Sequence, residues 1–341
     1  MRVADGGSMG SIIRRFASAT NGTTSGAHTA QATEIHWMPA GRAAPEVIAG
    51  VPSVHAAWNG SYPLCVDGHA LKLEEEVFLA LNAGHVLTTR GRRDPGSSLL
   101  SIYFAPQMLA DAFATLAPAD RELLIAGTQN GSVRLFEHLR DCDRSLISVM
   151  HYIAHHICAG VDDPQWYEEQ VSFLLRRLLT HEIALARTVA NMTHMKSWKR
   201  RETFTRLARV TDLIHSCYDR ALTIDELAEA AHWSRFHMMR EFKAVHGISP
   251  YEYLQRRRTQ TAARLLCSTE LSVAEIAERT GFHERSTLVR RLRRSRGLGA
   301  RALRMLAHDG QIHSSSQGLP HRMPTSAASG VNPATSISSV R

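Results

Sequence analysis

The chain has 341 residues, of which 44% are hydrophobic and 21% charged, and its formal net charge at pH 7 is +8. This length predicts two domains of ordinary size, and the hydrophobic content excludes a wholly disordered or fibrous protein. No apolar stretch is long enough to cross a bilayer, which excludes a membrane protein. The five cysteines are scattered and form no Cys-x-x-Cys pair, so they indicate no disulfide framework or thiolate zinc site and favour a reducing cytoplasm.

Both ends of the chain are predicted to be disordered tails. Residues 1–32 contain mainly Gly, Ser, Thr and Ala with little periodicity, and residues 307–341 are rich in Ser, Gly and Pro. Such compositions cannot bury enough apolar surface to fold. The folded part is therefore expected over residues 33–306.

Residues 33–195 read as a sheet followed by helices. Short strands are predicted as far as Phe104, because turn signals recur at 58–60, 66–68 and 82–84 between apolar runs. After Pro106 the apolar positions follow a helical period. We expect a small β-barrel or sandwich and then helices.

A long helix is predicted from about Pro164 to Ala190, with an apolar stripe that includes Val171, Leu174 and Leu178. The stripe has two interpretations. It could pair with the same helix of a second protomer, as regulators with two-fold symmetry require, or it could cover the sheet of its own domain. The sequence alone does not choose between them.

The positive charge lies in one third of the chain. Residues 196–306 contain 23 Lys and Arg against 12 Asp and Glu, a net charge of +11, whereas the remainder contains 17 against 20, a net charge of −3. This asymmetry predicts a domain that binds a polyanion, joined to a nearly neutral one. The charge alone is also consistent with a basic surface that only keeps the protein soluble.

An internal repeat occupies this basic region. Residues 222–229 (LTIDELAE) recur 49 positions later as residues 271–278 (LSVAEIAE). In each copy a hydroxyl residue, Thr223 or Ser272, stands three positions before a glutamate, which is the capping box of a helix start. Each copy therefore predicts a short helix, a tight turn and a second helix, the helix-turn-helix arrangement.

The second helix of each copy has an apolar face and a basic face. Met238 and Phe242 in the first copy correspond to Leu288 and Leu292 in the second, each pair at the i, i+4 spacing of a buried face. The residues predicted on the opposite, outer faces are Arg235, Phe236, Met239, Arg240 and Lys243 in the first copy and Arg285, Ser286, Val289, Arg290 and Arg293 in the second.

A connecting helix is predicted between the two units. Residues 250–266 would make a helix of roughly 25 Å at 1.5 Å per residue. Because successive major-groove faces lie about 34 Å apart, both second helices can enter adjacent groove segments of a slightly bent duplex. A helix fits the major groove, where each base pair presents its own donor and acceptor pattern. DNA is therefore the predicted polyanion.

Residues 200–306 resemble the DNA-binding domain of the AraC family of bacterial transcription regulators. The stretches that carry this resemblance are 222–231, 240–243, 247–254, 263–266, 271–277 and Gly281-Phe282. The resemblance implies that the base-reading positions are Phe236, Met239 and Arg240 in the first unit and Ser286, Val289 and Arg290 in the second. The two arginines are the best candidates to read guanine, and the three apolar residues to touch thymine methyl groups or, alternatively, to pack in the core.

Several positions depart from the family pattern. His232-Trp233 stands where the first turn usually has a glycine and an apolar residue, Arg296 stands where a bulky apolar residue closes the second unit, and Gly299-Ala300 replaces Ser-Pro. Arg257 and Thr259 occupy positions where leucine is common. We expect a looser second unit and a less tightly packed connecting helix.

The amino-terminal half is similar to the cupin-like sensor domain of many family members, which binds a small effector and dimerises through the following helices. The alternative is a cupin-type metal-dependent enzyme. However, His55, His69 and His85 are isolated, and the cluster His151, His155 and His156 has no carboxylate or thiolate at a suitable spacing, because Cys158 points elsewhere on the helix. A fused repair alkyltransferase would need a reactive cysteine in a recognisable setting, which Cys65 and Cys142 lack.

We therefore predict an α+β protein with a cupin-like β-barrel, following helices and an all-α domain of two helix-turn-helix units. Its function is predicted to be sequence-specific regulation of transcription as a homodimer in the bacterial cytoplasm, associated with the nucleoid. Double-stranded DNA and a small-molecule effector are the expected partners, with RNA polymerase added if the protein activates transcription. No catalytic residue, metal or cofactor is predicted, and the effector-binding residues remain unassigned.

Overall fold

The computed structural model describes residues 12–17, 32–41, 47–89, 94, 96–126, 128, 133–192 and 196–305. Residues 12–17, expected in a disordered tail, form strand β1 (Ile12–Ala17), which pairs antiparallel with β2 (Ala32–Met38). The predicted tail is wrong at this strand, because a six-residue segment can extend an existing sheet without a core of its own. The rest of that tail, and residues 307–341, lie outside the described residues.

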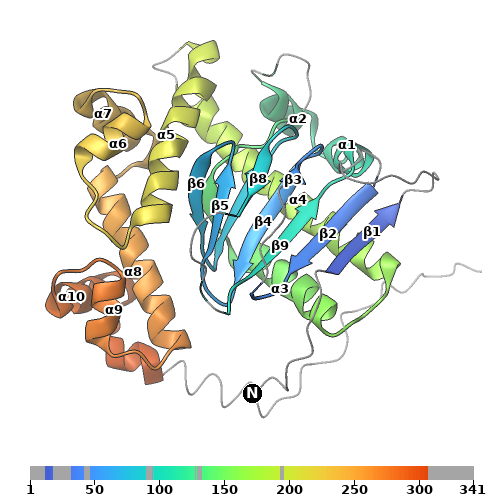
Figure 1. Cartoon of the computed structure of the whole chain (residues 1–341). Helices are drawn as coiled ribbons and strands as arrows, with labels where there is room; N and C mark the ends of the chain where they lie inside the picture. The colour runs from blue at the N-terminus through green and yellow to red at the C-terminus, as the bar shows by residue number, and fades with distance from the viewer. Residues whose placement is uncertain are drawn as a thin grey trace, which may run out of the picture.

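Two antiparallel sheets form the amino-terminal domain (Figure 1). A six-stranded sheet has the order β1-β2-β9-β4-β7-β10, and a four-stranded sheet has the order β3-β8-β5-β6. The remaining strands are β3 (Val47–Ile48), β4 (Ser53–Trp58), β5 (Tyr62–Val66), β6 (His69–Leu73), β7 (Val77–Leu81), β8 (Val86–Thr88), β9 (Ser98–Tyr103) and β10 (Leu139–Asp141). The predicted turns are confirmed, since Asn59, Asp67 and Gly84 adopt positive φ angles of 54°, 49° and 103° at the strand ends.

The inner faces of the two sheets pack against each other. Leu79 and Leu99 of the six-stranded sheet belong to the same buried cluster as Tyr62, Leu64 and Leu87 of the four-stranded sheet. Alternation of inward and outward side chains along each strand produces this core. The α+β class is confirmed, and the relationship to cupins stays a prediction.

Four helices accompany the six-stranded sheet. They are α1 (Pro106–Ala114), α2 (Pro118–Ile125), α3 (Arg144–Cys158) and α4 (Pro164–Ala190). Helix α4 has the predicted bounds, and its stripe of Val171, Leu174 and Leu178 is fully buried in one cluster with Ile35 and Leu100 of the sheet. The stripe therefore covers its own sheet, and a dimer would have to use another surface.

The carboxy-terminal module is all helical and begins with α5 (Ser197–Cys217). It continues with α6 (Ile224–Ala230), α7 (Arg235–His246), α8 (Pro250–Ser268), α9 (Val273–Arg279) and α10 (Arg285–Arg296). Figure 1 shows this module beside the sheets, with α7 and α10 on its far side from them. Across the described ranges, no helix combines the length and apolar character needed to cross a membrane.

Candidate nucleic-acid interface

The first helix-turn-helix unit consists of α6 and α7. The side-chain oxygen of Thr223 accepts a hydrogen bond from the Glu226 amide at 3.2 Å, and the Glu226 carboxylate accepts one from the Thr223 amide at 2.8 Å. This is the predicted capping box, and it satisfies the otherwise unpaired amides at the start of α6. Met238 and Phe242 are fully buried in the core of the unit, which fixes the orientation of α7.

The outer face of α7 carries the five predicted residues, and all of them are exposed. Phe236 is 72% exposed and Met239 is 41% exposed, so neither packs in the core. An apolar side chain left in water at this position is available for contact with thymine methyl groups. The structure thus separates α7 into a buried apolar face and an exposed basic and apolar face.

The second unit repeats this arrangement with α9 and α10. Ser272 and Glu275 form the second predicted capping box. Leu288 and Leu292 are fully buried, whereas Arg285, Ser286, Arg290 and Arg293 are exposed and Val289 is partly buried. The ten predicted contact residues therefore lie on the outward faces of α7 and α10, away from the core of each unit.

The turns of the two units differ at one equivalent position. Gly281 in the second turn has a φ angle of +75°, and His232, 49 positions earlier, has a φ angle of +53°. A side chain in this left-handed region strains the backbone, which glycine avoids. The departure from the family pattern noted at His232 is therefore a strained residue in an otherwise regular turn.

Neighbouring acids hold two of the arginines on α7. The Arg240 guanidinium lies 2.7 and 2.9 Å from one carboxylate oxygen of Glu241, which is itself buried, and Arg235 pairs with Asp225 of α6. The sequence analysis did not predict these ion pairs, although Glu241 follows Arg240 directly and Asp225 lies in the preceding helix. Both arginines are therefore already engaged in ion pairs within the module.

The connecting helix α8 starts at the predicted residue and ends two residues later than expected. Arg257 and Thr259 are each only 5% exposed, so the expectation of loose packing at these positions is wrong. Both side chains are polar, and both have interaction partners. The Thr259 hydroxyl donates a hydrogen bond to the Gln255 carbonyl, and Arg257 forms an ion pair with Glu74 of the amino-terminal domain. Arg291 of α10 also pairs with Glu252 of α8, at 2.9 Å.

Burial keeps the histidines in the core of the first unit neutral. Burial lowers the pKa of His215 and that of His246 to about 4, and both rings lie against Tyr253 of α8. These groups therefore add no positive charge at pH 7. The attraction for a polyanion comes from the exposed arginines and Lys243.

Outside this module, the histidines and cysteines considered for metal binding or catalysis are not grouped into a site: His55 and Cys65 are buried, whereas His69, His151 and His155 are exposed. His156 stacks on Trp166 with 4.1 Å between the ring centroids, and the ring centroids of His151 and Trp58 are 4.0 Å apart. Burial raises the pKa of the Cys142 thiol well above its usual range, opposite to the shift that activates a nucleophilic cysteine. Within the ranges that the structure describes, no three His, Cys, Asp or Glu side chains are grouped to hold a metal ion.

Comparison with known proteins finds relatives of the helix-turn-helix region. A family model described as a helix-turn-helix domain matches residues 227–305. The chain is 35% identical over 68 residues to a bifunctional transcriptional activator and DNA repair enzyme, AdaA, of Bacillus subtilis, a match that covers 20% of this chain and 32% of AdaA. It is 29% identical over 84 residues to the transcriptional activator AarP of Providencia stuartii, which covers 25% of this chain and 62% of AarP. The carboxy-terminal region is an AraC-type helix-turn-helix domain.

Solved structures also match, over different shares of the chain. The DNA-binding domain of AdpA, solved in complex with a target DNA, is 29% identical to the AraC-type domain, with a TM-score of 0.30 over 31% of this chain and 96% of that one. A longer match, ToxT from Vibrio cholerae, has 11% identity and a TM-score of 0.32 over 80% of this chain and 98% of ToxT. The first curated relatives are matched over less than two thirds of their length, so the match describes the AraC-type domain.

Proposed function

We propose that this protein is a sequence-specific, DNA-binding regulator of transcription. The observation that carries the proposal is the repeated exposure of a basic face on α7 and α10, each on a unit whose apolar side is fully buried. Two such helices on one module fit adjacent major-groove segments. The relatives matched by the AraC-type domain are named as transcription regulators, which supports the same function.

The proposed base-reading residues are Phe236, Met239 and Arg240 in the first unit and Ser286, Val289 and Arg290 in the second. The remaining predicted residues, Arg235, Lys243, Arg285 and Arg293, are proposed to contact phosphates. A phosphate contact strengthens binding to every sequence, whereas an arginine that donates two hydrogen bonds to guanine favours one sequence. This difference separates the two roles experimentally.

Replacing Arg290 by alanine is expected to weaken binding to the specific site by about fivefold to 150-fold, because a bidentate contact to guanine contributes about 1–3 kcal/mol of discrimination. Binding to random duplex should fall much less. Gel shifts with DNA from upstream of the protein's own gene, with and without competitor, measure both. Arg176→Ala, an equal loss of charge on the exposed side of α4, is the control and should leave both affinities unchanged. An equal loss for specific and random DNA would instead make Arg290 a phosphate contact.

The amino-terminal domain, residues 33–195, is proposed to sense a small-molecule effector. A cavity of about 720 Å³ lies between this domain and α5, with Leu71, Leu81 and Leu213 on its apolar walls and His85 and Asp212 among its polar groups. This volume and mixture of groups suit a small organic ligand.

The regulator is further proposed to act as a homodimer. Since the α4 stripe is buried, the surface that supports a dimer is the exposed aromatic group on α3 and α4, where Tyr152 is 48% and Phe173 37% exposed and Trp166 lies 5.0 Å from Tyr152. Tyr152→Glu is expected to halve the mass seen by light scattering, because it places a charge in an apolar contact. Tyr251→Glu, on the 64%-exposed tyrosine of α8, is the matched control. A monomeric wild-type protein would refute the dimer.

RNA polymerase is a proposed partner if the protein activates transcription, and the proposed location is the bacterial cytoplasm, at the nucleoid. The name of AdaA includes DNA repair, and a fused repair alkyltransferase is one of the enzymatic alternatives of the sequence analysis. The raised pKa of the Cys142 thiol argues against a nucleophile at that residue. We therefore propose a regulator without catalytic residues.

A further inference from the structure

Three consecutive glutamates form the turn between β6 and β7. Glu74, Glu75 and Glu76 face the DNA-binding module, and this acidic turn is absent from the sequence predictions. Glu76 has a φ angle of +63°, which is uncommon for a residue with a side chain, and its carbonyl accepts a hydrogen bond from the Cys142 amide at 2.7 Å. The turn is therefore held in one unusual conformation by the sheet itself.

Glu74 is the buried centre of a charged cluster that joins the two domains. Its carboxylate is 3.1 Å from the Arg257 guanidinium and accepts a hydrogen bond from the Tyr218 hydroxyl at 2.6 Å. Both partners belong to the helical module and both are buried. Burial alone would raise the pKa of the Glu74 carboxyl, but the Arg257 and Lys72 cations and the Tyr218 hydroxyl hold that pKa below its usual range.

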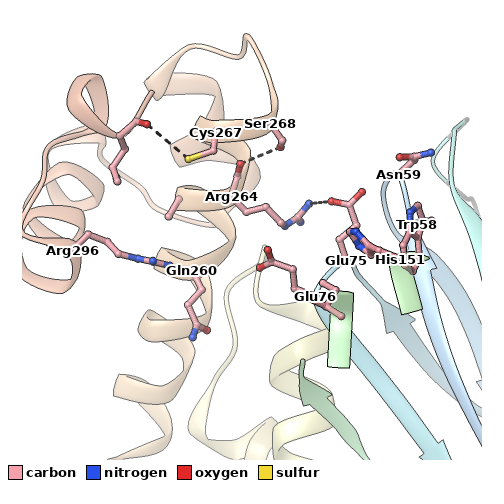
Figure 2. Close-up of a pocket in the computed structure, with 13 residues that line it drawn as sticks. Trp58, Asn59, Glu75, Glu76, His151, Gln260, Arg264, Cys267, Ser268 and Arg296 are labelled. Atoms are coloured by element: carbon pink, nitrogen blue, oxygen red, sulfur yellow. Dashed lines mark hydrogen bonds and ion pairs between the residues drawn. The ribbon is translucent and has the colours of Figure 1, made fainter. Parts of the chain in front are cut away.

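A second arginine of α8 contacts the next glutamate. Arg264, seven residues after Arg257 and so on the same face of the helix, lies 2.6 Å from Glu75. Figure 2 shows this pair at the edge of a cavity of about 450 Å³, with Trp58 and His151 on one side and Gln260 and Arg296 on the other. The cavity separates this part of α8 from the sheets, and α8 contributes no residue to the buried apolar clusters of the amino-terminal domain. Its described contacts with that domain are polar, through Arg257 and Arg264.

Helix α5 contacts one edge strand of each sheet at the same interface. The Ser216 hydroxyl accepts a hydrogen bond from the Lys72 amide of β6 at 3.1 Å, and the Asp212 carboxylate accepts one from the Leu139 amide of β10 at 2.7 Å. These two strands are the edge strands of their sheets, so their amides would otherwise face solvent. The two amides consequently report whether the module is docked.

We propose that the acidic turn Glu74–Glu76 positions the DNA-binding module on the sensor domain, with Arg257 as its main partner. A contact made of buried ion pairs is satisfied in one geometry only, so it specifies orientation more than it adds stability. The turn thus links the proposed effector domain to the placement of α7 and α10. Glu74 and Arg257 are positioning residues, and the inference rests on the proposed regulatory function for its biological meaning.

The test is amide hydrogen exchange in the full-length protein, followed by mass spectrometry on peptides that contain β6 and β10. Arg257→Leu, which restores the residue common in related domains, is expected to accelerate exchange of the Lys72 and Leu139 amides at least tenfold. Exchange in α9 and α10 should stay unchanged, because their core does not include Arg257. Arg256→Leu, the same change at the exposed neighbouring residue, is the matched control and should alter neither region.

A double-variant comparison separates positioning from general loss of stability. Glu74→Gln should accelerate the same two amides, and Glu74→Gln with Arg257→Leu should exchange no faster than the faster single variant, because both changes open one contact. Three results would each overturn the proposal. Exchange could accelerate evenly in all helices, the effects of the two substitutions on the exchange rates could multiply, or the exchange rates in β6 and β10 could stay unchanged. If Arg257→Leu does not fold, the exchange rates of the Lys72 and Leu139 amides in Glu74→Gln alone test the proposal.

The exchange result is independent of the proposed function. Failure of the wild-type protein to bind DNA in gel shifts would refute the regulator but would not affect docking at β6 and β10. With DNA binding established, Arg257→Leu should bind random duplex within about twofold of the wild type, since α7 and α10 are untouched, yet change expression from a regulated promoter more than fivefold. Unchanged expression would overturn the role of the turn in regulation.

Discussion

Replacing Gly281 by alanine is expected to lower the free energy of unfolding of the DNA-binding module by about 2–4 kcal/mol. A Cβ atom at this position would lie 2.8 Å from the Tyr218 carbonyl oxygen and 2.9 Å from that of Asp219, and backbone atoms cannot move aside as a flexible side chain can. The left-handed conformation, with φ at +75°, adds strain for any residue with a side chain. The expected loss is the sum of these two effects.

The same substitution should also weaken specific DNA binding. Arg258 of α8 donates hydrogen bonds to the carbonyls of Tyr218 and Arg220, and Gly281 packs on this joint between the two units. Pushing the second turn away would therefore rotate α10 relative to α7. Urea unfolding and gel shifts measure the two effects.

Gly297→Ala is the matched control for Gly281. Gly297 ends α10 with a φ angle of +70°, but a Cβ atom there meets nothing within 4 Å. The control carries the backbone strain without the collision, so its cost is expected to be about 1 kcal/mol. Equal losses for the two alanine variants would show that close packing at the joint is unimportant.

Replacing Glu182 by alanine is expected to destabilise the amino-terminal domain by about 3–5 kcal/mol. Glu182 on α4 is fully buried, pairs with Arg140 at 2.6 Å and accepts a hydrogen bond from the Phe136 amide at 2.7 Å. Removing it would leave the Arg140 guanidinium, itself 8% exposed, without this counter-charge. Urea unfolding followed by the fluorescence of the tryptophans measures the loss.

Two further variants test the cause. Glu168→Ala, on the exposed side of the same helix, should change stability by no more than about 0.5 kcal/mol. Arg140→Leu combined with Glu182→Leu should be more stable than Glu182→Ala, because apolar residues of similar volume leave no buried charge behind. A double variant as unstable as the single one would contradict the explanation by an unpaired charge.

The DNA-binding half was the more predictable part of the chain because its signals are local. The capping boxes at Thr223 and Ser272 and the i, i+4 pair of Leu288 and Leu292 depend on residues a few positions apart, and the structure confirms them. The outward placement of Phe236 followed from its phase relative to Met238. Local periodicity is set by helix geometry, so it can be read without knowing the rest of the fold.

What could not be predicted depends on contacts between distant segments. Arg257 was expected to loosen α8, but its partner Glu74 lies 183 positions earlier in the chain. The α4 stripe fits a dimer or its own sheet equally well, and only the folded sheet decides between them. Strand β1 has no local signal beyond six suitable residues, since pairing with β2 creates it.

The different surroundings of the two candidate arginines imply unequal contributions to DNA binding. Arg240 is folded back onto Glu241, whereas among the described residues no carboxylate pairs with Arg290. A contact of Arg240 with DNA therefore replaces an existing ion pair, whereas a contact of Arg290 replaces only its contact with solvent. We expect Arg290 to contribute more net free energy to specific binding than Arg240, which gel shifts with the two single alanine variants would measure.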